Sequence, residues 1–224
     1  MTMPLFDTAE FVDADFTSND WETPTPVARC FVSKVREFVE FPGHSFPARV
    51  LEIGAGNGQI TKHLPAHWNV TAIESKASRC EWGKEVAPNA EWRHATVEAY
   101  LSRPVTSFDV ILGNPPYGRK AFEPMLKILP SALKFSGTIA LLLPSTFFAT
   151  IWGADLLKNS GLSIVAKYEI RSRVSFLRNG VETKGRQCQD AFIFLGTGRP
   201  AVEIVNPWGE NHDEIIASRP QRPG

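Results

Sequence analysis

The sequence predicts an α/β domain built on a doubly wound, mostly parallel seven-stranded sheet. Short apolar runs alternate with helical stretches, which is typical of βαβ units. A glycine-rich turn follows the first apolar run, and an Asn-Pro-Pro-Tyr segment follows the fourth. With 224 residues and 43% hydrophobic content, the chain is long enough for one sizeable core, so a single domain is expected.

The predicted strands are the short apolar runs. They cover residues 49–53, 70–74, 91–94, 108–112, 138–143, 164–170 and 191–195. Helices are predicted over residues 25–39, 59–64, about 76–85, and 122–135. Strands in such an alternating order pair in parallel and present their carboxyl ends at one edge of the sheet.

Composition divides the chain into three parts. Residues 1–20 are predicted to form a flexible acidic arm, residues 21–198 the α/β domain, and residues 199–224 a C-terminal tail containing four prolines. No apolar run approaches the roughly 20 residues that cross a bilayer, and no leader segment is evident, so a cytoplasmic protein is expected. Three widely spaced cysteines and five scattered histidines indicate neither a disulfide framework nor a metal site.

A glycine-rich loop follows the first strand, with glycines at Gly54, Gly56 and Gly58. A dinucleotide-binding turn would have a further small residue at position 59, which is glutamine here. The loop allows a ligand to approach the backbone at the carboxyl end of a strand, where open α/β sheets bind ligands. A tight strand-to-helix turn is the alternative interpretation. Glu52, just before the glycines, is assigned to the same candidate cofactor site.

Glu74 ends the second strand, twenty residues after Gly54. A carboxylate at this position can accept two hydrogen bonds from a ribose diol, as the acid of dinucleotide folds does. The alternative is an acid that favours a helix N-terminus through the macrodipole. Together with the glycine loop, Glu74 predicts a ligand that contains adenosine.

The most specific segment is Asn114-Pro115-Pro116-Tyr117, directly after the fourth strand. Two prolines fix the backbone, and the Asn114 side-chain oxygen and the Pro115 carbonyl are both acceptors. Two acceptors that grip the hydrogens of a conjugated amine would favour a tetrahedral nitrogen and direct its lone pair toward a methyl donor. Tyr117 offers a flat face for stacking. An ordinary Asn-Pro turn with a buried tyrosine is the alternative.

The order of glycine loop, ribose acid and Asn-Pro-Pro-Tyr resembles class I S-adenosylmethionine-dependent methyltransferases that modify adenine N6 in DNA, over about residues 19–195. Trp21-Glu-Thr-Pro24 is similar to the N-terminal motif of one subgroup, which implies that Thr23 contacts the methionine end of the cofactor. Residues 19–24 also resemble orphan enzymes of phages and prophages. The resemblance implies S-adenosyl-L-methionine as cofactor, DNA as substrate and a flipped target base. It also implies the cytoplasm of a bacterial or phage-infected cell.

The resemblance is weaker at two positions. The family often has an aspartate after the third strand that contacts the cofactor adenine, and Thr96 or Val97 takes that place here. The second aromatic residue that sandwiches the flipped base is assigned to Phe176, with a core phenylalanine as the alternative.

A basic segment, residues 167–186, carries six bases and two acids and is interpreted as a local nucleic-acid surface or a solvated loop. Within the loop 177–189, Lys184 and Arg186 are expected to contact phosphates, which position an enzyme without reading sequence. No separate recognition domain is left over, so we expect a short or degenerate target, or specificity supplied by a partner subunit.

Three other functions share parts of this pattern. Glutamine amides of proteins and adenines of RNA present similar amines to an Asn-Pro-Pro-Tyr loop, and an adenosine-ligand binder without activity would keep only the glycine loop. Cytosine-C5 methylation requires a nucleophilic cysteine on a catalytic loop, and no cysteine follows a proline-rich turn here.

Overall fold

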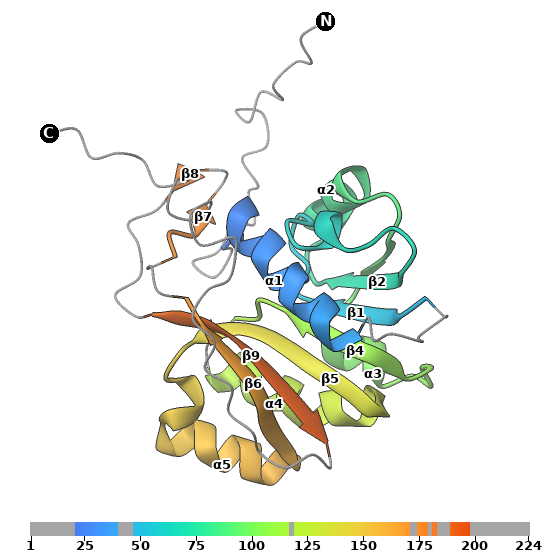
Figure 1. The fold of residues 1–224 in the computed structure, drawn as a ribbon. Coiled ribbons are helices and arrows are strands. Elements are labelled where there is room, and N and C mark those ends of the chain that lie inside the picture. Colours follow the sequence, from blue (N-terminus) through green and yellow to red (C-terminus); the bar gives the residue numbers. More distant parts are fainter. Residues whose placement is uncertain are drawn as a thin grey trace, which may run out of the picture.

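A seven-stranded sheet forms the centre of the fold (Figure 1). The computed structural model describes residues 21–39, 47–116, 119–170, 174–178, 181–182 and 189–197. The strands of the sheet are β1 (Arg49–Ile53), β2 (Asn69–Glu74), β3 (Glu91–His94), β4 (Phe108–Gly113), β5 (Leu133–Pro144), β6 (Leu162–Glu169) and β9 (Asp190–Thr197). A short hairpin of β7 (Leu177–Arg178) and β8 (Val181–Glu182) is separate from this sheet.

The strand order is β3-β2-β1-β4-β5-β9-β6. The first five strands in this order pair in parallel, and β9 lies between β5 and β6 and is antiparallel to both. The predicted seven-stranded, mostly parallel sheet is thus confirmed. The chain order reverses between β1 and β4, and open α/β sheets bind their ligands at such a switch point, outside the carboxyl ends of the strands.

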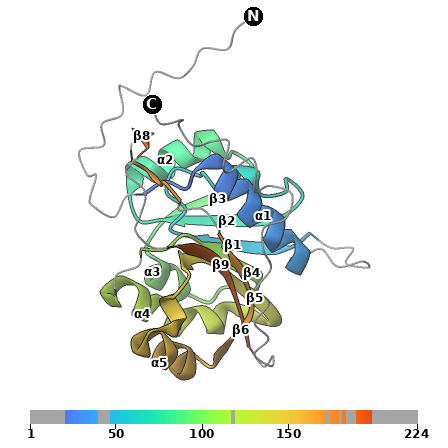
Figure 2. The same ribbon diagram turned by 60° about the vertical axis from the view of Figure 1, so that its left-hand side comes forward.

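Helices cover both faces of the sheet (Figure 2). One face packs against α1 (Thr25–Val39) and α2 (Ala77–Val86), and the other against α3 (Val97–Leu101), α4 (Arg119–Ile128) and α5 (Ile151–Ser160). Alternate residues of a strand point to opposite faces, so Val50 packs toward α1 while Leu51 and Ile53 pack toward α4. None of the described helices combines the length and the apolarity needed to cross a bilayer.

Aromatic contacts hold α1 against the strands β9 and β6. The ring of Phe31 stacks on Phe192 with 5.0 Å between centroids, and Phe38 stacks on Phe194 at 4.3 Å. Stacked pairs of this kind contribute about 0.5–1.5 kcal/mol beyond the burial of their area. They fix where α1 lies, and therefore where its N-terminal end meets the sheet.

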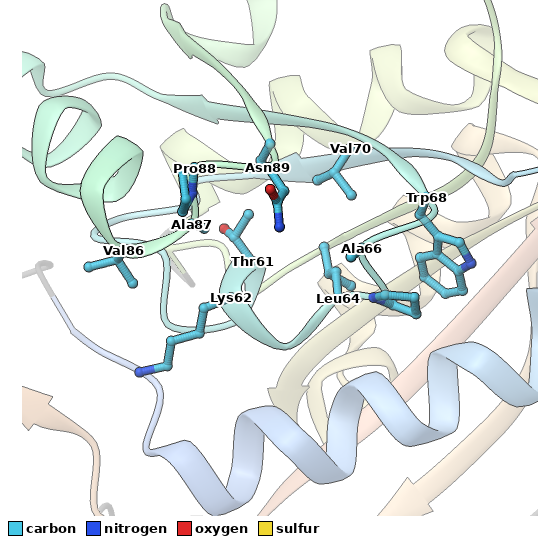
Figure 3. A pocket seen from close by; sticks show the side chains of 12 residues that line it. Thr61, Lys62, Leu64, Ala66, Trp68, Val70, Val86, Ala87, Pro88 and Asn89 are labelled. Carbon is cyan, nitrogen blue, oxygen red and sulfur yellow. The ribbon is translucent and has the colours of Figure 1, made fainter.

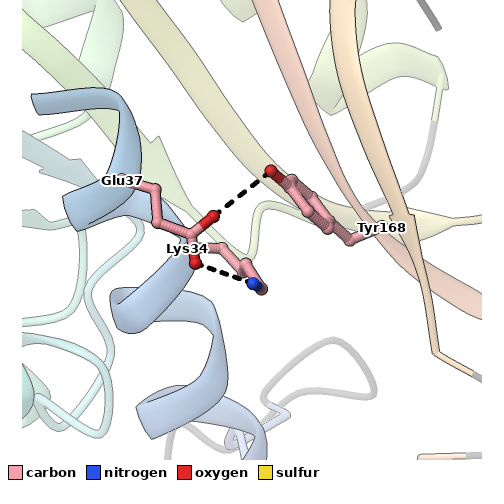
Figure 4. Close-up of polar contacts among 3 residues, drawn as sticks. All are labelled: Lys34, Glu37 and Tyr168. Carbon is pink, nitrogen blue, oxygen red and sulfur yellow. Dashed lines mark hydrogen bonds and ion pairs between the residues drawn. The ribbon is translucent and has the colours of Figure 1, made fainter. Parts of the chain in front are cut away.

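A polar contact supports the same packing (Figure 4). The Tyr168 hydroxyl of β6 donates to Glu37 of α1 at 3.5 Å, and Lys34 pairs with Glu37 at 2.7 Å while lying 5.0 Å from the centroid of the Tyr168 ring. Burial and the Glu37 carboxylate raise the pKa of Tyr168 to about 12, so the phenol stays protonated and keeps its donor.

The helix predicted over residues 25–39 has the bounds of α1, and the helix predicted over about 76–85 corresponds to α2. Two other predicted helices need correction. The run 122–135 is helical only in part: α4 ends at Ile128, a 3-10 turn follows over Leu129–Ala132, and residues 133–135 belong to β5. Pro130 lies in that turn and cannot donate to a continuing α-helix. The helix predicted over residues 59–64 is a single 3-10 turn, Thr61–His63.

Helix α5 was not predicted, although both of its ends carry recognisable signals in the sequence. The Thr150 hydroxyl accepts a hydrogen bond from the Gly153 amide at 3.0 Å, which is an N-cap. Gly161 ends the helix in the left-handed conformation with φ of 69°. Reading the Thr-x-x-Gly start together with Gly161 would have found the helix.

Gly113 is required by the close approach of β4 to β1. A Cβ at this position would lie 2.4 Å from the Ile53 carbonyl oxygen, a backbone atom that cannot move without disturbing the strand. We predict that Gly113→Ala lowers the free energy of unfolding by about 1–3 kcal/mol, measured by urea denaturation. Gly161→Asn is the control, because its site is open and asparagine tolerates a left-handed φ. Equal denaturation midpoints for the two variants would contradict the prediction.

Candidate active site

Parallel pairing brings four loops to one edge of the sheet. The register aligns Ile53 with both Ile73 and Gly113, and Glu74 with His94, so the carboxyl ends of β1, β2, β3 and β4 lie side by side. The loops that follow contain the glycines after β1, Ser75 and Lys76 after β2, residues 95–97 after β3, and residues 114–116 after β4.

The glycine loop adopts a backbone that other residues would not tolerate. Gly54, Gly56 and Gly58 have φ values of 61°, 58° and 83°, in the left-handed region. A Cβ built on Gly54 would meet no atom of the described residues within 4 Å, so these residues leave the space beside it open. The loop therefore exposes backbone to a space at the switch point that is available to a ligand.

Glu74 is anchored by this loop and by the start of α2. Its Oε2 accepts from the Gly56 amide at 2.8 Å, and its Oε1 accepts from the Lys76 amide at 2.9 Å and from the Ser75 hydroxyl at 3.3 Å. The side chain is 7% exposed. Two backbone amides thus orient the carboxylate, and the long Ser75 contact is the one that a ligand hydroxyl could replace.

Glu52 lies deeper than the sequence suggested. Its side chain is 1% exposed and its Oε2 accepts from the Thr61 hydroxyl at 2.7 Å. Burial raises the pKa of Glu52 to about 8, the Thr61 hydrogen bond lowers it, and the nearby Glu74 charge adds to the rise. The residue is therefore mainly protonated at neutral pH. It supports the turn after the glycine loop from within the core, which differs from the predicted ligand contact.

The N-terminal motif and the loop after β4 meet through one hydrogen bond. The Asn114 side-chain nitrogen donates to the Thr23 hydroxyl at 3.1 Å, across 91 positions of sequence. Thr23 is 4% exposed and Pro115 is buried, whereas Asn114 and Pro116 are partly exposed. Because this bond holds the amide nitrogen, it also fixes where the amide oxygen of Asn114 lies. Thr23 therefore sets the orientation of the Asn114 side chain.

The segment before α1 also pairs with β7, a contact that was not predicted from the sequence. The amide of Glu22 donates to the Leu177 carbonyl at 2.9 Å, and the Leu177 amide donates back to the Glu22 carbonyl at 3.0 Å. The loop that begins at Leu177 was predicted to face the substrate. Because Glu22 precedes Thr23, this pairing ties the base of that loop to the Asn114 site.

The other predicted site residues differ in their positions and contacts. Thr96 follows β3 at the expected edge, but its hydroxyl accepts from the Ala99 amide at 3.1 Å and caps α3. The Val97 side chain is buried in the core beneath α4. Phe176 is 3% exposed and packs in the core on the α1 face, so its position matches the core alternative and not a ring open to a base. Tyr117, Lys184 and Arg186 lie outside the described residues.

A surface groove between η1 (Thr61–His63) and the end of α2 is separate from this edge (Figure 3). Trp68, Val70 and Asn89 help to line it, beside residues 86–88, 61–62 and 64–66. Val70 is near the start of β2, whereas Glu74 ends that strand. The groove therefore lies toward the opposite end of the strands from the glycine loop and Asn114.

No protein-family model and no curated protein matches the sequence. Solved structures do match the fold. A Listeria monocytogenes protein named as a candidate class I S-adenosylmethionine-dependent methyltransferase aligns with a TM-score of 0.64 at 12% identity, covering 91% of this chain and 71% of that one. The fold is that of class I S-adenosylmethionine-dependent methyltransferases.

Two further matches agree. A Pyrococcus horikoshii protein named as a candidate RNA methyltransferase aligns with a TM-score of 0.62 at 12% identity, covering 79% of this chain and 87% of that one. A TehB-like S-adenosylmethionine-dependent methyltransferase of Corynebacterium glutamicum aligns with a TM-score of 0.51 at 15% identity, covering 76% and 87%. These likenesses establish the methyltransferase fold, and the chemistry must be argued from the site.

The raised pKa of Glu52 makes stability depend on pH. Between its ordinary value of 4.5 and about 8, the folded protein holds a proton that the unfolded chain releases, so this group's contribution to the free energy of unfolding falls as pH rises through that window. We predict that Glu52→Gln removes this fall.

The test compares thermal denaturation of wild type and Glu52→Gln across the same window. His63, whose pKa burial lowers to about 4, contributes the opposite trend at the acidic end, and subtracting the variant's curve from that of wild type removes this contribution. The melting temperature of wild type should decline relative to the variant toward pH 8. Parallel curves would show that Glu52 is ionised in the folded protein.

Proposed function

We propose that the chain transfers a methyl group from S-adenosyl-L-methionine to the exocyclic N6 amine of adenine in DNA. The observation that carries this proposal is the hydrogen bond of 3.1 Å between Asn114 and Thr23. In this bond the side-chain nitrogen of Asn114, which is the donor of the amide, is held by the Thr23 hydroxyl. We infer that the acceptor oxygen of Asn114, together with the Pro115 carbonyl, selects the amine.

The chemistry of an exocyclic amine requires such a pair of acceptors. Its lone pair is delocalised into the ring, so the nitrogen is a poor nucleophile. An amide oxygen from Asn114 and a carbonyl from Pro115 would each hold one hydrogen and favour a tetrahedral nitrogen. Fixed dipoles of this kind stabilise the positive charge that develops as the new bond forms.

The residues at the strand ends fit S-adenosyl-L-methionine. The open space beside Gly54 and the left-handed backbone of Gly56 admit a ligand close to the chain, and the oriented Glu74 carboxylate suits a ribose diol. Thr23 would contact the methionine end. When bound, the cofactor supplies an electrophilic methyl group on a sulfonium. Asn114, oriented by Thr23, would then direct the amine toward that methyl group.

DNA is the preferred substrate because the segment around Asn114 resembles the adenine-N6 group. Asn114 cannot reach an amine inside a stacked duplex, so the base must flip out at a cost of a few kcal/mol. Lys184 and Arg186 are proposed phosphate contacts that position the duplex. RNA adenine is the second candidate, and the likeness to the Pyrococcus horikoshii protein favours it. A partner subunit that supplies sequence specificity is part of the same proposal.

The deciding experiment incubates purified protein with cofactor labelled in its methyl group and, separately, with DNA, RNA and protein acceptors. Label in DNA that is recovered as N6-methyldeoxyadenosine supports the proposal. Label only in RNA or only in protein glutamine would assign the same amine chemistry to another substrate. Cofactor binding without transfer to any acceptor would indicate a non-catalytic adenosine-ligand binder.

Asn114→Ala should keep cofactor binding and lower kcat by about 100-fold or more, the loss seen when one preorganised dipole is removed from a transition state. Calorimetry gives the Kd for the cofactor and methyl incorporation gives kcat. An equal loss of both would assign Asn114 a structural role.

Thr23→Val should reduce kcat by about 10-fold, because the Asn114 donor loses its acceptor and the amide can rotate. Thr23→Ser should recover most of the activity, since it restores the hydroxyl. Thr106→Val, at an exposed position before β4, is the matched control. If Thr23→Val matched Thr106→Val in kcat, the Thr23 hydroxyl would have no orienting role.

Glu74→Ala should weaken cofactor binding by about 1.5–3 kcal/mol, the range for hydrogen bonds to a charged group. Glu85→Ala, at an exposed site near the end of α2, is the control for removal of a carboxylate. An unchanged Kd for the cofactor in the Glu74 variant, measured by calorimetry, would place the ribose contact elsewhere.

A further inference from the structure

The residues before α1 and the β7–β8 hairpin form a small ribbon, here called the hairpin ribbon, made of residues 21–23, 177–178 and 181–182. Glu22 pairs antiparallel with Leu177, and β7 pairs antiparallel with β8 through Arg178 and Val181. Figure 1 shows β7 and β8 beside the N-terminal end of α1, away from α5. The ribbon is therefore built from segments more than 150 positions apart in the sequence.

The two faces of the hairpin ribbon differ sharply in exposure. Arg178 and Val181 lie opposite one another and share a face. Extending the antiparallel pairing of Glu22 with Leu177 by one residue puts Trp21 opposite Arg178, on the same face. Trp21 is 43% exposed, Val181 is 68% exposed, and Arg178 is exposed. On the other face Glu22 is only 5% exposed. An aromatic ring, a guanidinium and an apolar side chain are thus displayed to the outside.

This face lies beside the residues that lead to the proposed methyl-transfer site. Trp21 is two residues before Thr23, whose hydroxyl accepts from Asn114 at 3.1 Å. A substrate that presents an amine to Asn114 could therefore extend along the hairpin ribbon. The backbone exchange between Glu22 and Leu177 holds the ribbon at a fixed place relative to Thr23.

We propose that the exposed face of the hairpin ribbon, formed by Trp21, Arg178 and Val181, binds the DNA strand next to the flipped base. This inference rests on the proposed function. Exposed aromatic side chains stack on bases, and arginine contacts both phosphates and the faces of rings. The occupant is nucleic acid because a ring and a guanidinium suit bases and phosphates, and because the segment that contains β7 and β8, residues 167–186, carries six bases and two acids.

The test measures binding of a fluorescein-labelled DNA duplex that the wild-type protein methylates, by fluorescence anisotropy on the full chain. Trp21→Ala should raise the Kd for DNA by about 10-fold, within the range that stacking of one base on an aromatic ring accounts for. Trp21→Phe should raise it by less than about threefold, because a ring remains. Arg178→Gln should weaken binding and reduce the slope of its salt dependence by about one unit.

Matched controls lie elsewhere on the surface. Ile151, 86% exposed at the start of α5, controls for loss of an exposed apolar side chain through Ile151→Ala. Arg103→Gln controls for loss of an exposed arginine. Both should leave the Kd for DNA unchanged. The Kd of each variant for the cofactor, from calorimetry, should equal that of wild type.

Two results would overturn the inference. If Trp21→Ala and Arg178→Gln bound DNA as tightly as the controls, the face would have another occupant. If they lost cofactor and DNA binding together, the ribbon would serve only the fold. Neither result would affect the proposed function, because the wild-type protein would still methylate the duplex. Failure of the wild-type protein to methylate any DNA is the separate result that removes both proposals.

Discussion

Parallel pairing is the constraint on which the rest of this structure depends. Because β1 pairs in parallel with both β2 and β4, the chain must leave all three strands at the same edge of the sheet. The glycine loop, Glu74 and Asn114 are far apart in sequence, and the register brings them to adjacent positions. Gly113 permits this arrangement, since a Cβ there would collide with the Ile53 backbone. The candidate site therefore follows from backbone geometry before any side chain is considered.

The N-terminal segment before α1 adds a part of the candidate site that does not come from the sheet. Stacking of Phe31 on Phe192 and of Phe38 on Phe194 fixes α1, and α1 in turn fixes Thr23 against Asn114. Orientation of one amide thus depends on aromatic packing along the whole helix. The pairing of Glu22 with Leu177 extends the same support to the hairpin ribbon.

The sequence was sufficient where a local pattern decides the structure. Strand positions, the bounds of α1 and the glycine loop follow from apolar runs and from residues that tolerate positive φ. The helix predicted over residues 122–135 was wrong in its second half, because the apolar spacing continues across Pro130 into β5. Periodicity alone does not separate a buried strand from a buried helix. Phe176 and Glu52 could not be placed because their depth in the core depends on packing between distant segments. The hydrogen bond between Thr23 and Asn114 likewise could not be predicted from the sequence, although both residues were assigned to the site.

The central proposal is that Asn114 holds the amine of an adenine in DNA, and nucleoside analysis of DNA from cells that express the chain tests it most directly. DNA and RNA from cells expressing wild type, Asn114→Ala or no protein are digested and their methylated nucleosides are measured by mass spectrometry. The account predicts N6-methyldeoxyadenosine above background in DNA from cells with the wild-type protein only. N6-methyladenosine confined to RNA, or equal signals from wild type and Asn114→Ala, would contradict it.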